Sequence, residues 1–164
     1  MANHPDKFYP LEFDRERNEP FLRLPAPHSN IIITPPRVAD EDISAIVTIL
    51  NDVQVTKWLQ GPPYPYKPEH ARDWLQRNET LCREIIQSIE VAEPNAFIDG
   101  CPVRILREIK EDGQEIYLGD CGIDGWGFED IGNLGEKRRL MEENDGRKAG
   151  DAEKEWTIGG NVKA

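Results

Sequence analysis

The chain has 164 residues, which is enough for one domain with a modest hydrophobic core and too few for two full domains. Its formal net charge of -11 at pH 7 argues against a protein that binds the nucleic-acid backbone, because such proteins need a basic face. No stretch approaches the ~20 apolar residues of a membrane span, and the N-terminus, MANHPDKFYP, lacks the apolar core of a signal peptide. The composition therefore predicts a soluble, cytoplasmic protein that binds neither nucleic acid nor a membrane.

Residues 1–30 mix charged side chains with five prolines and show neither helical nor strand periodicity. They are predicted to form a polar, proline-rich N-terminal arm that lies along a surface. The β-branched run Ile31–Thr34 follows and is stopped by Pro35 and Pro36, which predicts the first strand.

A first helix is predicted from Asp40, which can cap it, to Asn51 and Asp52. Its apolar residues recur at spacings of three and four, as an amphipathic helix requires: Ile43, Ile46, Val47 and Leu50.

Residues 53–71, VQVTKWLQGPPYPYKPEHA, form a connector in which one glycine and several prolines should prevent any regular element. Its aromatic residues, Trp58, Tyr64 and Tyr66, could line an apolar pocket on a loop that proline has already stiffened. They could equally pack beneath the loop, and the residues alone do not choose between the two.

A long second helix is predicted to begin at Pro68 and to end before Pro94. Its apolar face would consist of Ala71, Trp74, Leu75, Leu81, Cys82, Ile85 and Ile89.

Residues 103–123, VRILREIKEDGQEIYLGDCGI, predict a β-hairpin with Asp112 and Gly113 in its turn. A short amphipathic helix over residues 136–144 and a solvated loop, DGRKAGDAEKE, follow. A further strand is predicted to begin at Trp156.

The stretch GDCGIDGWG, residues 119–127, fails as a calcium loop started at Asp120, because Gly122 and Ile131 stand where oxygen ligands are needed. It also fails as a phosphate loop, since it continues a strand and opens no helix. Glycines that let a strand bend are the preferred interpretation, and no metal site is predicted.

The cysteines and histidines show no catalytic or ligand spacing. Cys82, Cys101 and Cys121 are odd in number and far apart, so buried free thiols are expected. The histidines, His4, His28 and His70, have no nucleophile partner in a recognisable motif. His70 is interpreted as a surface residue.

The sequence RLPAPHSNIIITPPRVADEDISAIVTILNDVQVTKWLQGPPYPYKPEHARDWL, residues 23–75, resembles the N-terminal half of a GNAT-superfamily N-acetyltransferase. The stretches DGCPVRILREIKEDGQEIYLGDCGI and EWTIG fit the same pattern, and the resemblance covers roughly residues 22–159. It is closest to the branch of ribosomal-protein acetyltransferases of the RimJ and RimL type, in a version common among fungal proteins.

This resemblance implies an α+β fold with a mainly antiparallel sheet and two helices, in the order β-α-α-β-β-β. The chain would then divide into the arm (1–30), a partial N-acetyltransferase domain (31–159) and a C-terminal tail outside the family pattern (160–164). In the family, a glycine-rich loop, Q/R-x-x-G-x-G/A, follows the strand that would begin at Trp156. The expectation is therefore a domain truncated before the acetyl-CoA phosphate loop.

The activity implied by the resemblance is transfer of an acetyl group from acetyl-CoA, the co-substrate, to a primary amine on a small molecule, a protein N-terminus or a lysine. The loop between the two helices walls the acceptor site in this family, which assigns Trp58, Tyr64 and Tyr66 to substrate binding. No catalytic residue and no cofactor-binding residue is assigned, and the chain by itself is expected to be inactive. The alternative is a non-catalytic module that binds a ligand or associates with itself through its incomplete sheet.

Overall fold

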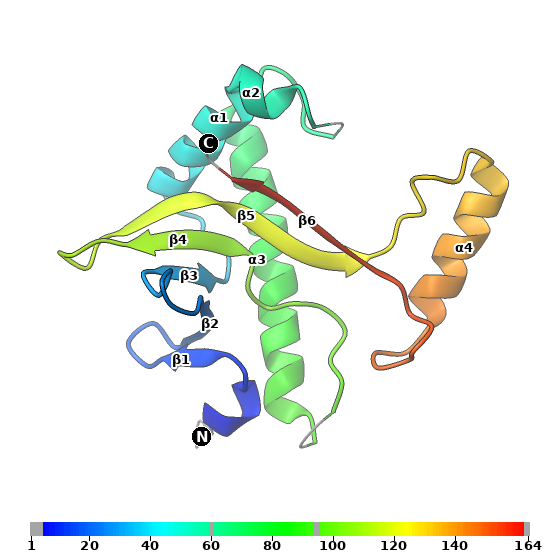
Figure 1. Ribbon diagram of the computed structural model, residues 1–164, viewed down its shortest axis with the longest axis horizontal. Helices are drawn as coiled ribbons and strands as arrows, with labels where there is room; N and C mark the ends of the chain where they lie inside the picture. Colours follow the sequence, from blue (N-terminus) through cyan, green and yellow to red (C-terminus); the bar gives the residue numbers. More distant parts are fainter. Residues whose placement is uncertain (1–4, 60, 94–95, 163–164) are drawn as a thin grey trace.

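The computed structural model describes residues 5–59, 61–93 and 96–162 and shows an α+β fold (Figure 1). Its six strands form one open antiparallel sheet in the order β1-β2-β3-β4-β5-β6. The strands are β1 (Glu12–Asp14), β2 (Glu19–Arg23), β3 (Ile31–Thr34), β4 (Ile105–Ile109), β5 (Glu115–Gly125) and β6 (Trp156–Val162). The helices are the 3-10 helix η1 (Pro5–Phe8) and α1 (Asp40–Asn51), α2 (Val53–Thr56), α3 (Pro68–Val91) and α4 (Leu134–Gly146). Within the described ranges, no helix combines the length and the apolar character needed to cross a bilayer.

The hydrophobic core lies between α1, α3 and one face of β4 and β5. Its buried members are Ile43, Ile46, Ile49, Leu50, Tyr66, Ala71, Leu75, Ile105 and Tyr117. The predicted apolar spacing of α1 is thereby confirmed. In contrast, α4 lies to one side of this body, past the C-terminal end of β5 and the N-terminal end of β6 (Figure 1).

The prediction for the apolar face of α3 is wrong at Leu81, whose exposed fraction is 54%. The buried positions of this helix are Ala71, Leu75 and Cys82. Leu81 precedes Cys82 by one residue, and one residue is a rotation of about 100° around a helix axis. Leu81 therefore faces solvent.

The sequence predicted an N-terminal arm without regular structure, but residues 5–23 contain η1, β1 and β2. β1 and β2 extend the sheet, with Leu22 paired to Ile33 of β3, and Phe8 is buried with its ring 5.2 Å from that of Phe13. These strands are too short for an alternating pattern to stand out from the charged residues around them. Their pairing with β3 supplies what local sequence does not.

The connector and the C-terminal strand each contain more regular structure than the sequence predicted. The connector begins with α2, because the Asp52 side chain accepts a hydrogen bond from the Gln54 backbone N–H at 2.8 Å and so caps a helical turn. The predicted strand at Trp156 is confirmed as β6, and residues 160–162 continue it along β5. The resemblance implied two helices. The described residues contain two more, of which α4 confirms the helix predicted over residues 136–144 and α2 was not predicted.

A buried ion network joins the arm, α1 and the hairpin. Arg107 of β4 donates two hydrogen bonds to Asp42, at 2.9 and 2.6 Å, and one to the hydroxyl of Thr34 at 2.9 Å. Glu115 of β5 accepts hydrogen bonds from Arg37, at 2.6 Å, and from Arg17 in the turn between β1 and β2. The arm is therefore tied to the hairpin by charge as well as by strand pairing.

Glu115 is expected to make stability depend on pH. Burial alone would raise the pKa of Glu115, but hydrogen bonds from Arg37 and Arg17 and their positive charge outweigh burial and lower it. The contribution of this carboxylate is therefore present above its unfolded pKa of about 4.3 and is lost as the pH falls through the lower folded pKa.

We expect the free energy of unfolding, measured in urea across the acid range, to fall less steeply in Glu115→Gln than in the wild type. Glu84→Gln, on the exposed face of α3, serves as the control and should retain the wild-type slope. Identical slopes for all three proteins would contradict the role given to Glu115.

Candidate functional site

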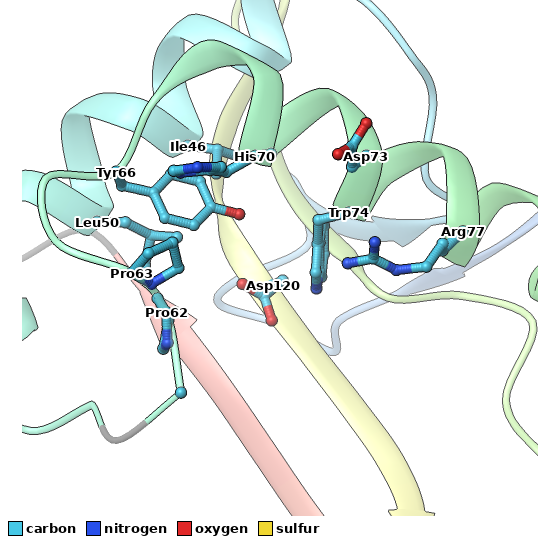
Figure 2. Close-up of a pocket in the computed structure, with 11 residues that line it drawn as sticks. Ile46, Leu50, Pro62, Pro63, Tyr66, His70, Asp73, Trp74, Arg77 and Asp120 are labelled. Atoms are coloured by element: carbon cyan, nitrogen blue, oxygen red, sulfur yellow. The ribbon is translucent and has the colours of Figure 1, made fainter.

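A pocket with a volume of about 420 Å³ lies between the connector, α3 and β5 (Figure 2). Figure 2 shows Pro62 and Pro63 on one side of it and Trp74 and Arg77 on the other. Its lining consists of Ile46, Leu50, Gly61, Pro62, Pro63, Tyr66, His70, Asp73, Trp74, Arg77 and Asp120. A concave site with apolar walls and a few polar groups is the usual form of a small-molecule site.

The three predicted substrate-binding residues do not come together at this pocket. Tyr66 lines it and is buried, with 6% of its surface exposed. Trp58 and Tyr64 are 79% and 71% exposed and are not among the lining residues. The amino group of Lys57 lies over the Trp58 ring, 5.5 Å from its centroid.

The side chain of Asn51 fixes the position of Tyr66. Its Oδ1 accepts a hydrogen bond from the Tyr66 backbone N–H at 2.8 Å, and its Nδ2 donates to the Tyr66 carbonyl at 2.7 Å. The Tyr66 ring also meets the edge of the His70 ring, with centroids 5.4 Å apart. The last residue of α1 therefore holds the connector at the point where its aromatic ring enters the pocket.

Asp120 reaches the pocket because of a β-bulge in β5. Leu106 pairs with Gly119, whereas the next residue, Arg107, pairs with Tyr117, so Leu118 is an extra residue on β5. In a regular strand, residues 117 and 120 would face opposite sides of the sheet. The extra residue reverses the alternation, and Asp120 shares the helix-covered face with Tyr117.

One face of α3 supplies the remaining polar groups of the pocket: His70, Asp73, Trp74 and Arg77. Their spacing of three, one and three residues places them on one side of a helix. His70 is half-buried in this position, and its Nδ1 accepts a hydrogen bond from the Lys67 backbone N–H at 3.1 Å. It lies at the partly exposed wall of the pocket, and the interpretation as a surface residue stays a prediction.

Sequence reasoning missed Asp73, Arg77 and Asp120 as pocket residues and Asn51 as the residue that positions Tyr66. The stripe on α3 carried a usable signal, because its polar residues recur with helical spacing beside the apolar face. For Asp120 no signal existed, since the bulge follows from how β4 and β5 pair.

The charges around Tyr66 act on its hydroxyl group. Burial raises the pKa of the Tyr66 hydroxyl above its ordinary value; Arg77 opposes this shift, and Asp120 and Asp73 add to it. The hydroxyl therefore stays protonated at neutral pH, and it points into the pocket near Asp120 (Figure 2). The lining thus offers a hydroxyl donor, the carboxylates of Asp73 and Asp120, the Arg77 guanidinium and the aromatic rings of Tyr66 and Trp74.

The glycine-rich stretch at residues 119–127 and the cysteines lie outside the pocket lining, apart from Asp120. Residues 119–125 form the second half of β5, so they make neither a calcium loop nor a phosphate loop. Within the described part of the chain, no three His, Cys, Asp or Glu side chains are placed to hold a metal ion. All three cysteines are free; Cys82 is buried, and burial raises the pKa of its thiol to about 12.

Residues 147–152, RKAGDA, match the spacing Q/R-x-x-G-x-G/A. They follow the C-terminal end of α4 and precede β6, so they do not open a helix. A phosphate site of that kind depends on the N–H groups and the positive potential of a helix N-terminus. The position of this stretch therefore argues against a role in binding pyrophosphate.

Comparison of the chain with protein-family models, with curated proteins and with solved structures finds no match. A functional hypothesis must accordingly be argued from the chemistry and position of the pocket.

Proposed function

We propose that this chain provides the acceptor side of a GNAT-type N-acetyltransferase, in which a primary amine takes an acetyl group from acetyl-CoA. The observation that carries the proposal is the pocket, where the Asp120 carboxylate lies beside the rings of Tyr66 and Trp74. A primary amine is an ammonium ion at neutral pH, and carboxylates and aromatic faces are the groups that attract it.

The order of the elements supports the same proposal. From β3 onward the chain runs through two long helices, α1 and α3, and then through β4, β5 and β6, which contains the β-α-α-β-β-β order implied by the resemblance. The pocket is bounded by the connector between these helices, the segment that walls the acceptor site in the GNAT family.

The reaction requires the amine nitrogen to lose a proton and attack the thioester carbonyl. The new N–C bond forms as the C–S bond breaks, and the CoA sulfur leaves as a thiolate that takes up a proton. Asp120 would hold the amine and orient its nitrogen, while Tyr66 and Trp74 would enclose its first carbons and exclude water. The proposal assigns no residue of this chain to the CoA pyrophosphate.

Amine binding is tested by isothermal titration calorimetry with butylamine. We expect the wild type to bind it and Asp120→Asn to bind about tenfold more weakly or worse, because the variant keeps the shape of the side chain and removes its charge. Asp112→Asn, in the turn between β4 and β5, is the matched control and should bind as the wild type does. Equal affinities for Asp120→Asn and the wild type would remove the basis of the proposal.

The transfer step is tested separately by adding acetyl-CoA to the chain saturated with butylamine. A transferase releases free CoA and N-butylacetamide in equal amounts, which a thiol reagent and mass spectrometry detect. Because the chain by itself is expected to be inactive, amine binding without product is the result that an acceptor side alone predicts, whereas product would show that the chain also uses acetyl-CoA.

A second candidate function is self-association through β6. This strand pairs with β5 on one side and has no partner strand on its other side within the described residues. Its Ile158 is 80% exposed and lies opposite the exposed Ile123 of β5. An open edge beside exposed apolar side chains favours pairing with another chain.

The test is the molar mass in solution by size exclusion with light scattering. Self-association predicts a dimer or larger species that Ile158→Lys converts to a monomer, whereas Leu134→Lys, on the exposed side of α4, should leave it intact. A wild-type chain that stays monomeric at every concentration would refute this candidate.

A further inference from the structure

We infer that the preferred occupant of the pocket is an amino acid with separated ends: a primary amine held at Asp120 and a carboxylate, a short carbon chain away, held at Arg77. This inference rests on the proposed function and specifies the class of its acceptor. It follows from the two charges that face the pocket and from the aromatic ring between them.

The first observation is that the Arg77 guanidinium makes no hydrogen bond and no ion pair with any other described residue. Most arginines of this chain pair with carboxylates, including Arg72 and Arg83 on the same helix. Arg77 instead lines the pocket, and its guanidinium points toward Trp74 (Figure 2). A guanidinium that faces a cavity has the planar pair of donors that suits a ligand carboxylate.

The second observation concerns Asp73, the other carboxylate of the pocket lining. Asp73 is exposed, and Figure 2 shows its carboxylate pointing away from Asp120. A diamine would need two carboxylates that converge on the cavity, so this direction favours Arg77 over Asp73 as the second charged contact of a ligand held at Asp120.

The electrostatics of Tyr66 agree with this placement. Of the three charged neighbours that act on its hydroxyl group, Arg77 has the largest effect on the pKa, ahead of Asp120 and Asp73. The guanidinium is therefore close enough to act on the interior of the pocket.

The third observation is the position of Trp74, whose ring lies between Asp120 and Arg77 (Figure 2). An apolar surface between an acidic and a basic group suits a ligand with a methylene chain between an ammonium and a carboxylate. Burial of each CH₂ group against such a surface contributes roughly 0.8 kcal/mol, so the chain length should affect affinity.

The experiment compares ligands of matched length by calorimetry: ω-amino acids from glycine to 6-aminohexanoate, the corresponding alkylamines, and the corresponding diamines. We expect at least one ω-amino acid to bind about tenfold more tightly than its alkylamine, because a charge-assisted pair with Arg77 is added. Arg77→Gln should abolish this preference. Arg72→Gln, at an arginine of the same helix that is exposed as Arg77 is but lies outside the pocket, should preserve it.

The outcomes separate this inference from the proposed function. If alkylamines bind in an Asp120-dependent manner but a carboxylate adds no affinity, or if Arg77→Gln keeps the preference, the inference is overturned and the amine site stands. If diamines bind most tightly, the inference is overturned in favour of a dicationic acceptor. If no amine or amino acid binds, both the inference and the proposed amine site fail.

Discussion

Replacement of Asp42 by alanine is expected to lower the free energy of unfolding by about 3–5 kcal/mol, because it leaves a buried cation without its main partner. Arg107 and Asp42 are both buried and share two hydrogen bonds, at 2.9 and 2.6 Å. Without the carboxylate, the guanidinium keeps the Thr34 hydroxyl and a more distant Glu115, at 3.8 Å. Neither replaces a bidentate carboxylate, so the cost should lie in the range for broken buried pairs.

The control is Asp40→Ala on the same helix. Asp40 is exposed and lies 3.5 Å from Arg72, so this pair should contribute less than about 1 kcal/mol. Both values come from urea unfolding followed by circular dichroism. The double variant Asp42→Leu with Arg107→Met should cost less than Asp42→Ala alone, since it removes the unpaired charge. Equal effects of Asp42→Ala and Asp40→Ala would contradict the importance given to burial.

Replacement of Leu75 by alanine is expected to lower the free energy of unfolding by about 2–5 kcal/mol, because it opens a cavity in the core. Leu75 is fully buried and belongs to the cluster that joins α1, α3, β4 and β5. The surrounding side chains come from four elements, so they cannot all move inward to fill the space.

Leu81→Ala is the matched control, since it makes the same chemical change on the same helix at an exposed position. Its effect should stay within about 0.5 kcal/mol, as is usual for surface substitutions. If the two variants lose equal stability in urea, the assignment of the buried face of α3 is incorrect.

Urea unfolding also shows whether a variant that loses amine binding has lost the pocket contact or the fold. Leu75 and Asp42 lie in the body that supports the pocket, whereas Asp120 and Arg77 line it. A loss of amine binding in Asp120→Asn or Arg77→Gln with an unchanged urea midpoint therefore reports on the pocket. A loss accompanied by a lower midpoint reports on the fold.

Local sequence predicted the elements whose pattern is strong within one segment. The β-branched run of β3, the spacing of Ile43, Ile46 and Leu50 in α1, and the turn with Asp112 and Gly113 all match the structure. Prediction failed for β1, β2 and α2, which contain only three to five residues each. In so short a segment, strand pairing or a single capping side chain decides the conformation.

For the candidate site, the sequence alone determined that an aromatic, proline-rich connector joins two amphipathic helices, because composition and periodicity are local properties. Only the tertiary structure decided that Tyr66 enters the pocket while Trp58 and Tyr64 face solvent. That choice depends on the hydrogen bonds between Asn51 and the Tyr66 backbone. Likewise, Asp120 reaches the pocket through the bulge at Leu118, which arises from the pairing of β4 with β5. Both contacts join segments that the chain must fold to bring together, so no local pattern encodes them.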